Sequence, residues 1–352
     1  MRVFISIMIF IAFIISLVFA SVFKEYDLYN IADQNLDTKK FYVGGFNNSS
    51  KILFAMAPIN NVSMKKQNKN YRLFFINLEN NKIDSIDIPM YSIQQFLFSN
   101  DDSKLFLIGN KLTTLAVIDM KNYSYRELST VKYGKKSFRF FGLIWYEGEN
   151  LFTTGYYMDE KQNATDDYIV KIESVENKPS FINTGFNITA FEKKFDPLNF
   201  VILNHSQIAF VGKENKKQYL GLVDKELKMK KIDEGETFSG LSFSYNFILY
   251  GIKKNNQIYY SLFDYNSNKI YLQKQIDFPP SYNFISKNSE SIIIGNFKPR
   301  VNRMDVYVGK KEENYTLEKV IDNEMLGYIK ISHDGKYFVF TQRNGKIKVF
   351  KI

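Results

Sequence analysis

The chain contains two histidines, His205 and His333, which are the obvious candidates for a general base or a metal ligand. The chain has no cysteine, which excludes disulfides, thiolate-bound zinc and thiol nucleophiles. Each histidine precedes a short apolar strand within a polar segment, and neither has a serine or aspartate at a spacing typical of a catalytic pair. We interpret both as solvated turn residues, and we predict no metal and no cofactor.

A second candidate site is a group of carboxylates at Asp159, Glu160, Asp166 and Asp167. Calcium binds several carboxylate oxygens at once, but the spacing of these residues matches no calcium loop, so we interpret the segment as a solvated loop. The chain also lacks the Gly-x-Ser-x-Gly motif of α/β-hydrolases. We therefore expect no α/β-hydrolase domain of the dipeptidyl-peptidase kind in this sequence.

The chain is basic, with 47 Lys and Arg against 37 Asp and Glu. Such an excess favours an anionic partner. Arginine supplies only seven of the basic residues, whereas nucleic-acid recognition depends heavily on the arginine fork, so we predict no nucleic-acid partner. Because AT-rich codons also produce many lysines, the position of the charge is more informative than its amount.

The N-terminus has the pattern of an export signal. Residues 3–19 are almost entirely apolar, follow Arg2 and precede the small residue Ala20. We predict a signal peptide over 1–20 and a protein that works in the periplasm or outside a bacterial cell, since eukaryotic secreted chains usually carry disulfides. The apolar run nearly spans a bilayer, so an uncleaved membrane anchor over 3–23 is the alternative.

The rest of the chain contains a repeat, in which a polar turn is followed by a short apolar strand. The repeated strand starts near seven landmarks, which are Lys51, Lys104, Asn150, Gln207, Asn246, Ser291 and Lys336. The landmarks are 39 to 57 residues apart, and four-stranded propeller blades repeat at about 40 to 50 residues. A second turn signal, an apolar strand ending in an Asx or Glu residue, marks the third strand of five units. Each unit therefore predicts one blade.

The last unit ends one strand short, with strands expected near 326–331, 337–341 and 346–352. The segment Glu25–Ile31 is otherwise unassigned, so we expect it to close the ring by pairing with the last strand. We expect all prolines between strands and no helix of useful length. The sequence thus predicts an all-β fold: one seven-bladed β-propeller of four-stranded antiparallel blades over 21–352, closed by an N-terminal strand.

The segment Ile331–Phe340 resembles a turn and strand of known propellers. It reads Ile-Ser-His-Asp-Gly-Lys-Tyr-Phe-Val-Phe and is similar to the Ser-Pro-Asp-Gly-Lys turn of WD-repeat and Tol-Pal-type periplasmic propellers, with His333 in the place of the proline. No unit ends in Trp-Asp, and the single tryptophan, Trp145, is expected in an inner strand. Such propellers are mostly protein-binding platforms, so the resemblance implies a binding role.

The basic residues are concentrated on one side of the predicted ring. The loops between second and third strands all lie on one face, and here they carry fifteen basic and five acidic residues, whereas the turns on the opposite face mix both signs. The two longest basic loops belong to the first and sixth blades, which are near neighbours in a closed ring. The predicted anion contacts are Lys65, Lys66, Lys69, Arg300, Arg303 and Arg343.

Polar or aromatic residues at the starts of inner strands could converge on the axis of the ring. The central-channel candidates are Gln94, Arg139, Glu192, Tyr282 and Tyr328. We predict a non-enzymatic, exported binding or scaffold protein of the cell envelope, which engages a protein or an anionic envelope polymer through its basic face. The alternative is a secreted, lactonase-like propeller hydrolase with a carboxylate-bound metal in the central channel.

Overall fold

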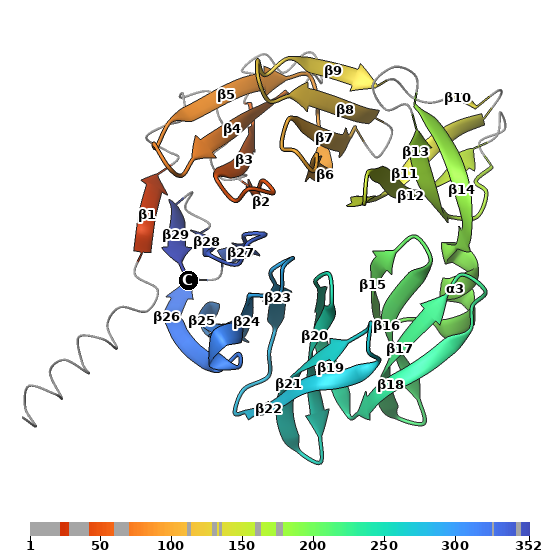
Figure 1. Ribbon diagram of the computed structural model, residues 1–352, viewed down its shortest axis with the longest axis vertical. Helices are drawn as coiled ribbons and strands as arrows, with labels where there is room; N and C mark the ends of the chain where they lie inside the picture. The colour runs from red at the N-terminus through yellow and green to blue at the C-terminus, as the bar shows by residue number, and fades with distance from the viewer. Residues whose placement is uncertain are drawn as a thin grey trace, which may run out of the picture.

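The computed structural model describes residues 22–27, 42–59, 70–110, 114–128, 132–133, 136–158, 163–173, 179–325, 327–342 and 346–352. Over these residues the chain forms seven antiparallel sheets arranged as blades around an axis (Figure 1). The predicted signal peptide lies outside this part of the chain, and residues 22 and 23 of the alternative anchor belong to a β-strand. No helix in the described ranges is long and apolar enough to cross a membrane.

In the first three blades, strands that follow one another in the chain are paired. Blade 1 contains β2 (Tyr42–Phe46), β3 (Ile52–Pro58), β4 (Tyr71–Asn77) and β5 (Ile83–Ile88). Blade 2 contains β6 (Ile93–Phe98), β7 (Lys104–Gly109), β8 (Thr114–Asp119) and β9 (Tyr125–Leu128). Blade 3 contains β10 (Lys132–Tyr133), β11 (Lys136–Glu147), β12 (Asn150–Met158), β13 (Tyr168–Glu173) and β14 (Ser180–Asn187), so it has five strands instead of the expected four.

The remaining blades have four strands each. Blade 4 contains β15 (Asn199–Asn204), β16 (Gln207–Glu214), β17 (Lys217–Asp224) and β18 (Met229–Gly235), and blade 5 contains β19 (Thr237–Phe243), β20 (Phe247–Lys254), β21 (Gln257–Asp264) and β22 (Lys269–Ile276). Blade 6 contains β23 (Tyr282–Ile285), β24 (Ser291–Lys298), β25 (Arg303–Lys310) and β26 (Leu317–Met325). Blade 7 contains β27 (Gly327–Ile331), β28 (Tyr337–Gln342), β29 (Lys346–Lys351) and β1 (Val22–Asp27).

The core of the molecule lies between neighbouring blades. The middle strands of each blade are short, continuous apolar runs, as expected for strands covered on both faces. In β3, Phe54 packs into one cluster with Phe98 and Leu105 of blade 2, whereas Leu53 and Ala55 pack with Val339 of blade 7. Successive side chains of a strand point to opposite faces, so each blade contributes to the clusters on both of its sides.

Closure of the ring by an N-terminal strand is confirmed. Strand β1 pairs antiparallel with β29 as the outermost strand of blade 7, and the two lie side by side in Figure 1. The strand was expected at Glu25–Ile31, but it runs from Val22 to Asp27. Residues 28–31 lie outside the described ranges. Tyr26 is buried against Ile347 and Val349 of β29, which explains why this segment is used.

Two local expectations are wrong. A helix, α3 (Ile188–Phe195), links β14 to β15, with Asn187 Oδ1 accepting a hydrogen bond from the Ala190 amide as its N-cap. Eight residues make about two turns, which is too short for a visible helical period. A 3₁₀ turn also occurs at Lys311–Glu313. Pro58 is the last residue of β3 instead of lying between strands, so its missing amide hydrogen falls at the end of the ladder.

Candidate functional site at the axis and on the loop face

A cavity of about 370 Å³, here called the axial pocket, lies between the innermost strands of blades 6, 7 and 1. Its walls include Tyr282 and Phe284 of β23, Tyr42 of β2, and Tyr328, Ile329 and Lys330 of β27. A first strand starts on the face that also carries the loops between second and third strands, which we call the loop face. Because Tyr42 and Tyr282 begin their strands, the axial pocket belongs to the loop face.

Three partly exposed tyrosines surround the axial pocket. Tyr42, Tyr282 and Tyr328 are 42%, 39% and 56% exposed, and the ring centroids of Tyr42 and Tyr328 are 6.4 Å apart. Gly327 begins β27 beside them, where a β-carbon would stand 2.2 Å from the Thr341 carbonyl oxygen. A side chain at this position would therefore push β27 away from β28 and change the shape of the pocket.

Lys330 is the charged residue of the axial pocket. It is open to water, yet the surrounding protein lowers the pKa of its ammonium group through desolvation. No Asp or Glu of the described residues lies within ion-pair distance of it. Lys330 is thus an exposed cation in the wall of the pocket, with no carboxylate of the described residues within ion-pair distance.

The axial pocket brings together two of the five central-channel candidates, Tyr282 and Tyr328. Gln94 lies on β6, where its Nε2 donates to Ser92 Oγ at 2.8 Å, and Arg139 lies on β11; neither lines the axial pocket. Glu192 was expected at the start of an inner strand, and this is wrong, because it lies on α3.

Tyr42 was not among the predicted central-channel residues, although it lines the axial pocket. Tyr42 occupies the same strand-start position as Tyr282, so a tyrosine beginning an inner strand was the available signal.

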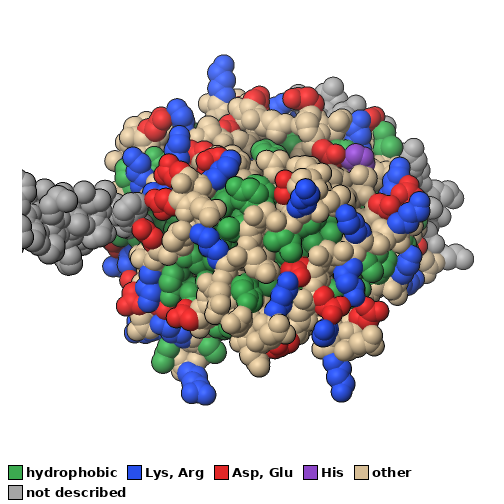
Figure 2. All heavy atoms as spheres, turned by 60° about the horizontal axis from the view of Figure 1, so that its bottom comes forward, with side chains coloured by type: hydrophobic (Ala, Val, Ile, Leu, Met, Phe, Trp, Pro, Cys, Tyr) green, Lys and Arg blue, Asp and Glu red, His purple; other side chains and the backbone are tan. Residues whose placement is uncertain are grey.

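The basic residues of the loop face are partly neutralised by carboxylates. The Lys254 ammonium group lies 2.5 Å from an Asp233 carboxylate oxygen. The corresponding distances are 2.8 Å for Lys253 to Glu236 and 2.8 Å for Lys298 to Asp305. Two more pairs are Lys217 with Glu234 and Lys346 with Glu25. These carboxylates lie on third or fourth strands, or on connections, that reach the same face. A count of loop residues alone had missed them. Lysines and carboxylates are correspondingly intermixed on the rim in Figure 2.

The six predicted anion contacts are distributed unevenly over the described structure. Arg300 and Arg303 are exposed near β25, and the Arg303 guanidinium donates to the Asn323 carbonyl oxygen at 2.7 Å. Lys65, Lys66, Lys69 and Arg343 lie outside the described residues.

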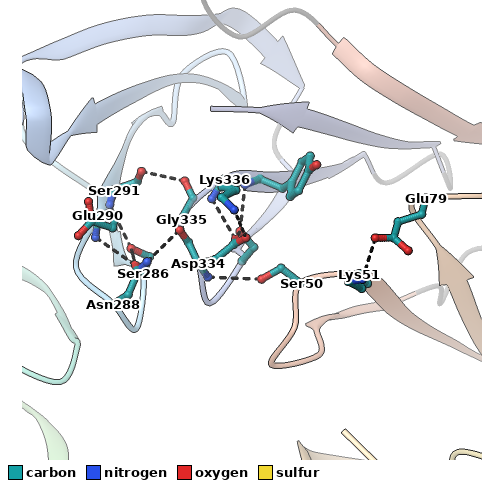
Figure 3. A network of polar contacts seen from close by, with 12 residues as sticks. Ser50, Lys51, Glu79, Ser286, Asn288, Glu290, Ser291, Asp334, Gly335 and Lys336 are labelled. Atoms are coloured by element: carbon teal, nitrogen blue, oxygen red, sulfur yellow. Dashed lines mark hydrogen bonds and ion pairs between the residues drawn. The ribbon is translucent and has the colours of Figure 1, made fainter. Parts of the chain in front are cut away.

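On the opposite face, here called the turn face, the turns between first and second strands are joined from blade to blade. Asn288 of blade 6 donates through its backbone amide to the His333 carbonyl oxygen and through Nδ2 to the Asp334 carbonyl oxygen. Ser291 Oγ donates to the Gly335 carbonyl oxygen at 2.8 Å, and the Asp334 amide donates to Ser50 Oγ at 3.3 Å (Figure 3). These contacts connect blade 6 to blade 7 and blade 7 to blade 1.

Both histidines lie in these turns, as predicted, but they are not simply solvated. His205 Nδ1 is 2.8 Å from Glu147 Oε1, and the His205 ring stacks on Phe152 of blade 3. His333 is partly buried, and burial together with the nearby Lys287 charge lowers the pKa of its ring to about 4. The partners come from neighbouring blades, so no spacing within one repeat could reveal them.

The acidic segment is described in part. Asp166 accepts a hydrogen bond from Asn187 Nδ2, and burial raises the pKa of Asp167 beside Glu192. Asp159 and Glu160 lie outside the described residues. Within the described ranges, no three His, Asp or Glu side chains are placed to hold a metal ion.

No protein-family model matches the chain, and no curated protein matches it. Solved structures with a similar fold include the β-propeller domain of Cps50 (Swd1) from Myceliophteria thermophila, at 12% identity over 89% of this chain and 99% of that chain, with a TM-score of 0.53. The uncharacterized protein lmo1340 from Listeria monocytogenes EGD-e matches at 11% identity over 90% of this chain and 95% of that chain, with a TM-score of 0.53.

The WD40 domain of Pan2 from Neurospora crassa matches at 10% identity over 95% of this chain and 97% of that chain, with a TM-score of 0.50. The fold is therefore that of the WD40-type β-propellers, which confirms the resemblance drawn from Ile331–Phe340. Likeness at this level of identity concerns the fold alone.

Proposed function

We propose that this protein is a binding or scaffold protein that engages a protein partner through its loop face. The observation that supports this most is the distribution of exposed large apolar side chains. Three of those on the loop face, Tyr42, Tyr282 and Tyr328, gather around the axial pocket. Those at the turn-face ends of strands, such as Phe23, Met229 and Phe243, are spread over blades 7, 4 and 5. Tyrosines and other large side chains of this kind supply much of the contact energy in protein interfaces.

We infer that the partner is also anionic. The net charge of +10 favours attraction of such a partner, although the ion pairs on the loop face reduce the charge available there. Arg300 and Lys216 are exposed, and Lys65, Lys66 and Lys69 belong to the same set of loops in the sequence. Electrostatic attraction would steer the encounter, and the exposed tyrosines would supply the contact area.

We further infer that the protein works outside the cytoplasm, either free or held at a membrane through residues 3–23. The apolar run after Arg2 and the small residue Ala20 support this proposal. Mass spectrometry of the protein from its native host should give a chain that begins at Ser21. An intact chain that retains Met1 and fractionates with membranes would support the anchor instead.

A photo-crosslinking experiment tests the proposed working face. A photoreactive amino acid at Val301 or Leu198 samples the loop face outside the axial pocket, and the same group at Tyr245 samples the turn face as a matched exposed control. We expect one discrete protein adduct from the loop-face positions in living cells and none from Tyr245. Adducts confined to Tyr245, or an absence of adducts at all three positions, would contradict the proposal.

A further inference from the structure

We infer that the axial pocket binds the carboxylate of an aspartate or glutamate side chain that the partner inserts between Tyr42, Tyr282 and Tyr328, with Lys330 as the charged contact. This inference rests on the proposed function, because the acidic side chain belongs to the protein bound at the loop face. The shared chemistry is that of an organic carboxylate on an apolar stem.

The dimensions of the axial pocket suit one inserted side chain. Its volume of about 370 Å³ lies at the lower end of the range for small-molecule sites, so it accommodates a side chain and its neighbours but no folded element. The pocket is also continuous with the proposed contact face, because the exposed Met325 lies two residues before Gly327 in the pocket wall. A partner seated on the loop face would therefore have direct access to it.

Lys330 distinguishes this pocket from the rest of the loop face. Within β27, Ile329 packs with Val306 of blade 6 and also lines the axial pocket, whereas Tyr328 and Lys330 lie on the other side of the strand and line the pocket from there. Lysines such as Lys298 and Lys254 have a carboxylate of the chain within bonding distance, but Lys330 has none among the described residues. The exposed Lys330 ammonium group belongs to a pocket that has no carboxylate of its own, so an incoming anion would gain a Coulombic contact with it.

The direction of the pKa shift agrees with this reading. Desolvation by the surrounding protein atoms lowers the pKa of the exposed Lys330, with no opposing contribution from a nearby carboxylate. A bound carboxylate would favour the ammonium form and raise the pKa of Lys330 again. The tyrosines of the lining add neutral hydroxyl donors to the pocket.

An anion fits the axial pocket better than a cation. Three tyrosine faces could in principle hold a cationic side chain by cation–π contacts. The lining, however, contains one lysine and no carboxylate, so a second cation would be repelled at short range. The tyrosine rings instead suit the apolar stem of an acidic residue and the backbone on either side of it.

Nuclear magnetic resonance of the full chain provides the test. Reductive methylation with ¹³C-formaldehyde labels the lysines, and the Lys330→Arg variant identifies the Lys330 signal. The probes are acetyl-Leu-Glu-Leu-amide and acetyl-Leu-Gln-Leu-amide, which differ only in charge. We expect saturable movement of the Lys330 signal and a rise of its pKa with the glutamate peptide, and binding of the glutamine peptide weaker by about tenfold or more.

Two variants separate the charged contact from the shape of the pocket. Lys330→Met keeps the length of the side chain and should abolish the preference for glutamate over glutamine. Lys230→Met, at an exposed position on the outer strand β18, should leave the preference unchanged. Tyr328→Ala should weaken both peptides. Equal binding of the two peptides, a stationary Lys330 signal, or an unchanged preference in Lys330→Met would overturn the inference.

Sodium propionate is the third probe, and it distinguishes a free acid from a protein side chain. If propionate binds as tightly as the glutamate peptide, the pocket binds a small free acid, and the inference that the carboxylate belongs to a partner protein is wrong. If the peptides fail but crosslinking at Val301 still captures a partner, the inference fails and the proposed function stands. If the glutamate peptide binds but no loop-face adduct forms in cells, the proposed function fails instead.

Discussion

Asp102 shows how one side chain joins two blades. Its Oδ1 accepts from the Asn48 amide at 2.7 Å, and its Oδ2 accepts from Asn47 Nδ2 at 2.9 Å and from the Ser49 amide at 2.8 Å. The donors belong to blade 1 and Asp102 to blade 2. Replacing one carboxylate oxygen by an amide would therefore place a donor opposite two other donors.

We expect Asp102→Asn to lower the free energy of unfolding by about 1–2 kcal/mol, because the asparagine still tolerates the left-handed backbone (φ 59°) but loses the Oδ2 contacts. Asp119→Asn is the matched control in the same blade, because Asp119 accepts a hydrogen bond from the Lys121 amide through Oδ1 alone. An asparagine can make this contact, since Asn77 Oδ1 accepts from the Glu79 amide in the equivalent turn of blade 1. Urea denaturation measures both. Equal effects would show that the contact between the blades contributes nothing.

His333 should make stability depend on pH. Burial and Lys287 lower the pKa of its ring from 6.5 to about 4, so the unfolded chain binds this proton at a higher pH than the folded chain does. The stabilisation from neutral His333 is complete above about pH 6.5 and is lost as the pH falls through 4.

We expect the stability difference between wild type and His333→Gln to decrease by about 1–3 kcal/mol between pH 7.5 and pH 4. Lys287, Asp102 and Asp334, the charged groups that act on the ring, are present in both proteins, so their own titration largely cancels in the difference. A constant difference across this range, measured by urea denaturation, would show that His333 protonates freely.

At the scale of the element, β1 connects the two ends of the described chain. Tyr26 contributes most of its buried contact, packing against Ile347 and Val349, and its hydroxyl donates to Asn81 Oδ1 at 3.3 Å. The strand also covers the edge of β29, which would otherwise present unpaired backbone groups. Closure thus depends on both burial and backbone pairing.

We expect Tyr26→Ala to reduce the free energy of unfolding by about 3 kcal/mol, because it removes a buried aromatic ring at the closure of the ring. Tyr26→Phe keeps the packing and loses the hydrogen bond to Asn81, so its effect should stay below about 1 kcal/mol. Thermal and urea denaturation of the two variants compare these contributions. If the phenylalanine variant were as unstable as the alanine variant, packing at β1 would not be what closes the ring.

At the scale of the molecule, the loop face combines exposed tyrosines with a basic charge. Partner binding should therefore weaken steeply as salt rises, since attraction between surface charges reaches about 8–10 Å at physiological ionic strength. The combined change of Lys65, Lys66, Arg300 and Arg303 to glutamate should weaken binding and remove most of its salt dependence.

The control variant changes Lys225 and Lys228 on the turn face to glutamate, and it should bind the partner like the wild type. Binding is measured against the partner identified by crosslinking, at 50 and 500 mM salt. Unchanged binding of the fourfold variant at both salt concentrations would mean that the basic loops serve solubility alone.

The number of blades, most of their strands and the closing strand could be predicted from the sequence, because these features are local; the fifth strand of blade 3 was not predicted. A polar turn before an apolar strand recurs at Lys104, Gln207 and Ser291, and the structure starts β7, β16 and β24 at these residues. The missing strand of the last unit likewise pointed to the N-terminus. Helix α3 was not predicted, because two helical turns give too little periodic signal in the sequence. The start of β1 was predicted three residues too late.

The axial pocket, by contrast, depends on the tertiary structure. Tyr42 and Tyr328 are separated by most of the chain, and they meet because β1 closes the ring and places blades 7 and 1 side by side. The pairing of Lys298 with Asp305 and of Lys254 with Asp233 likewise depends on register between strands. A repeat pattern records which residues face a neighbouring blade. The curvature and closure of the ring decide which side chains converge at the axis, and so which lysine lies beside Tyr42 and Tyr328.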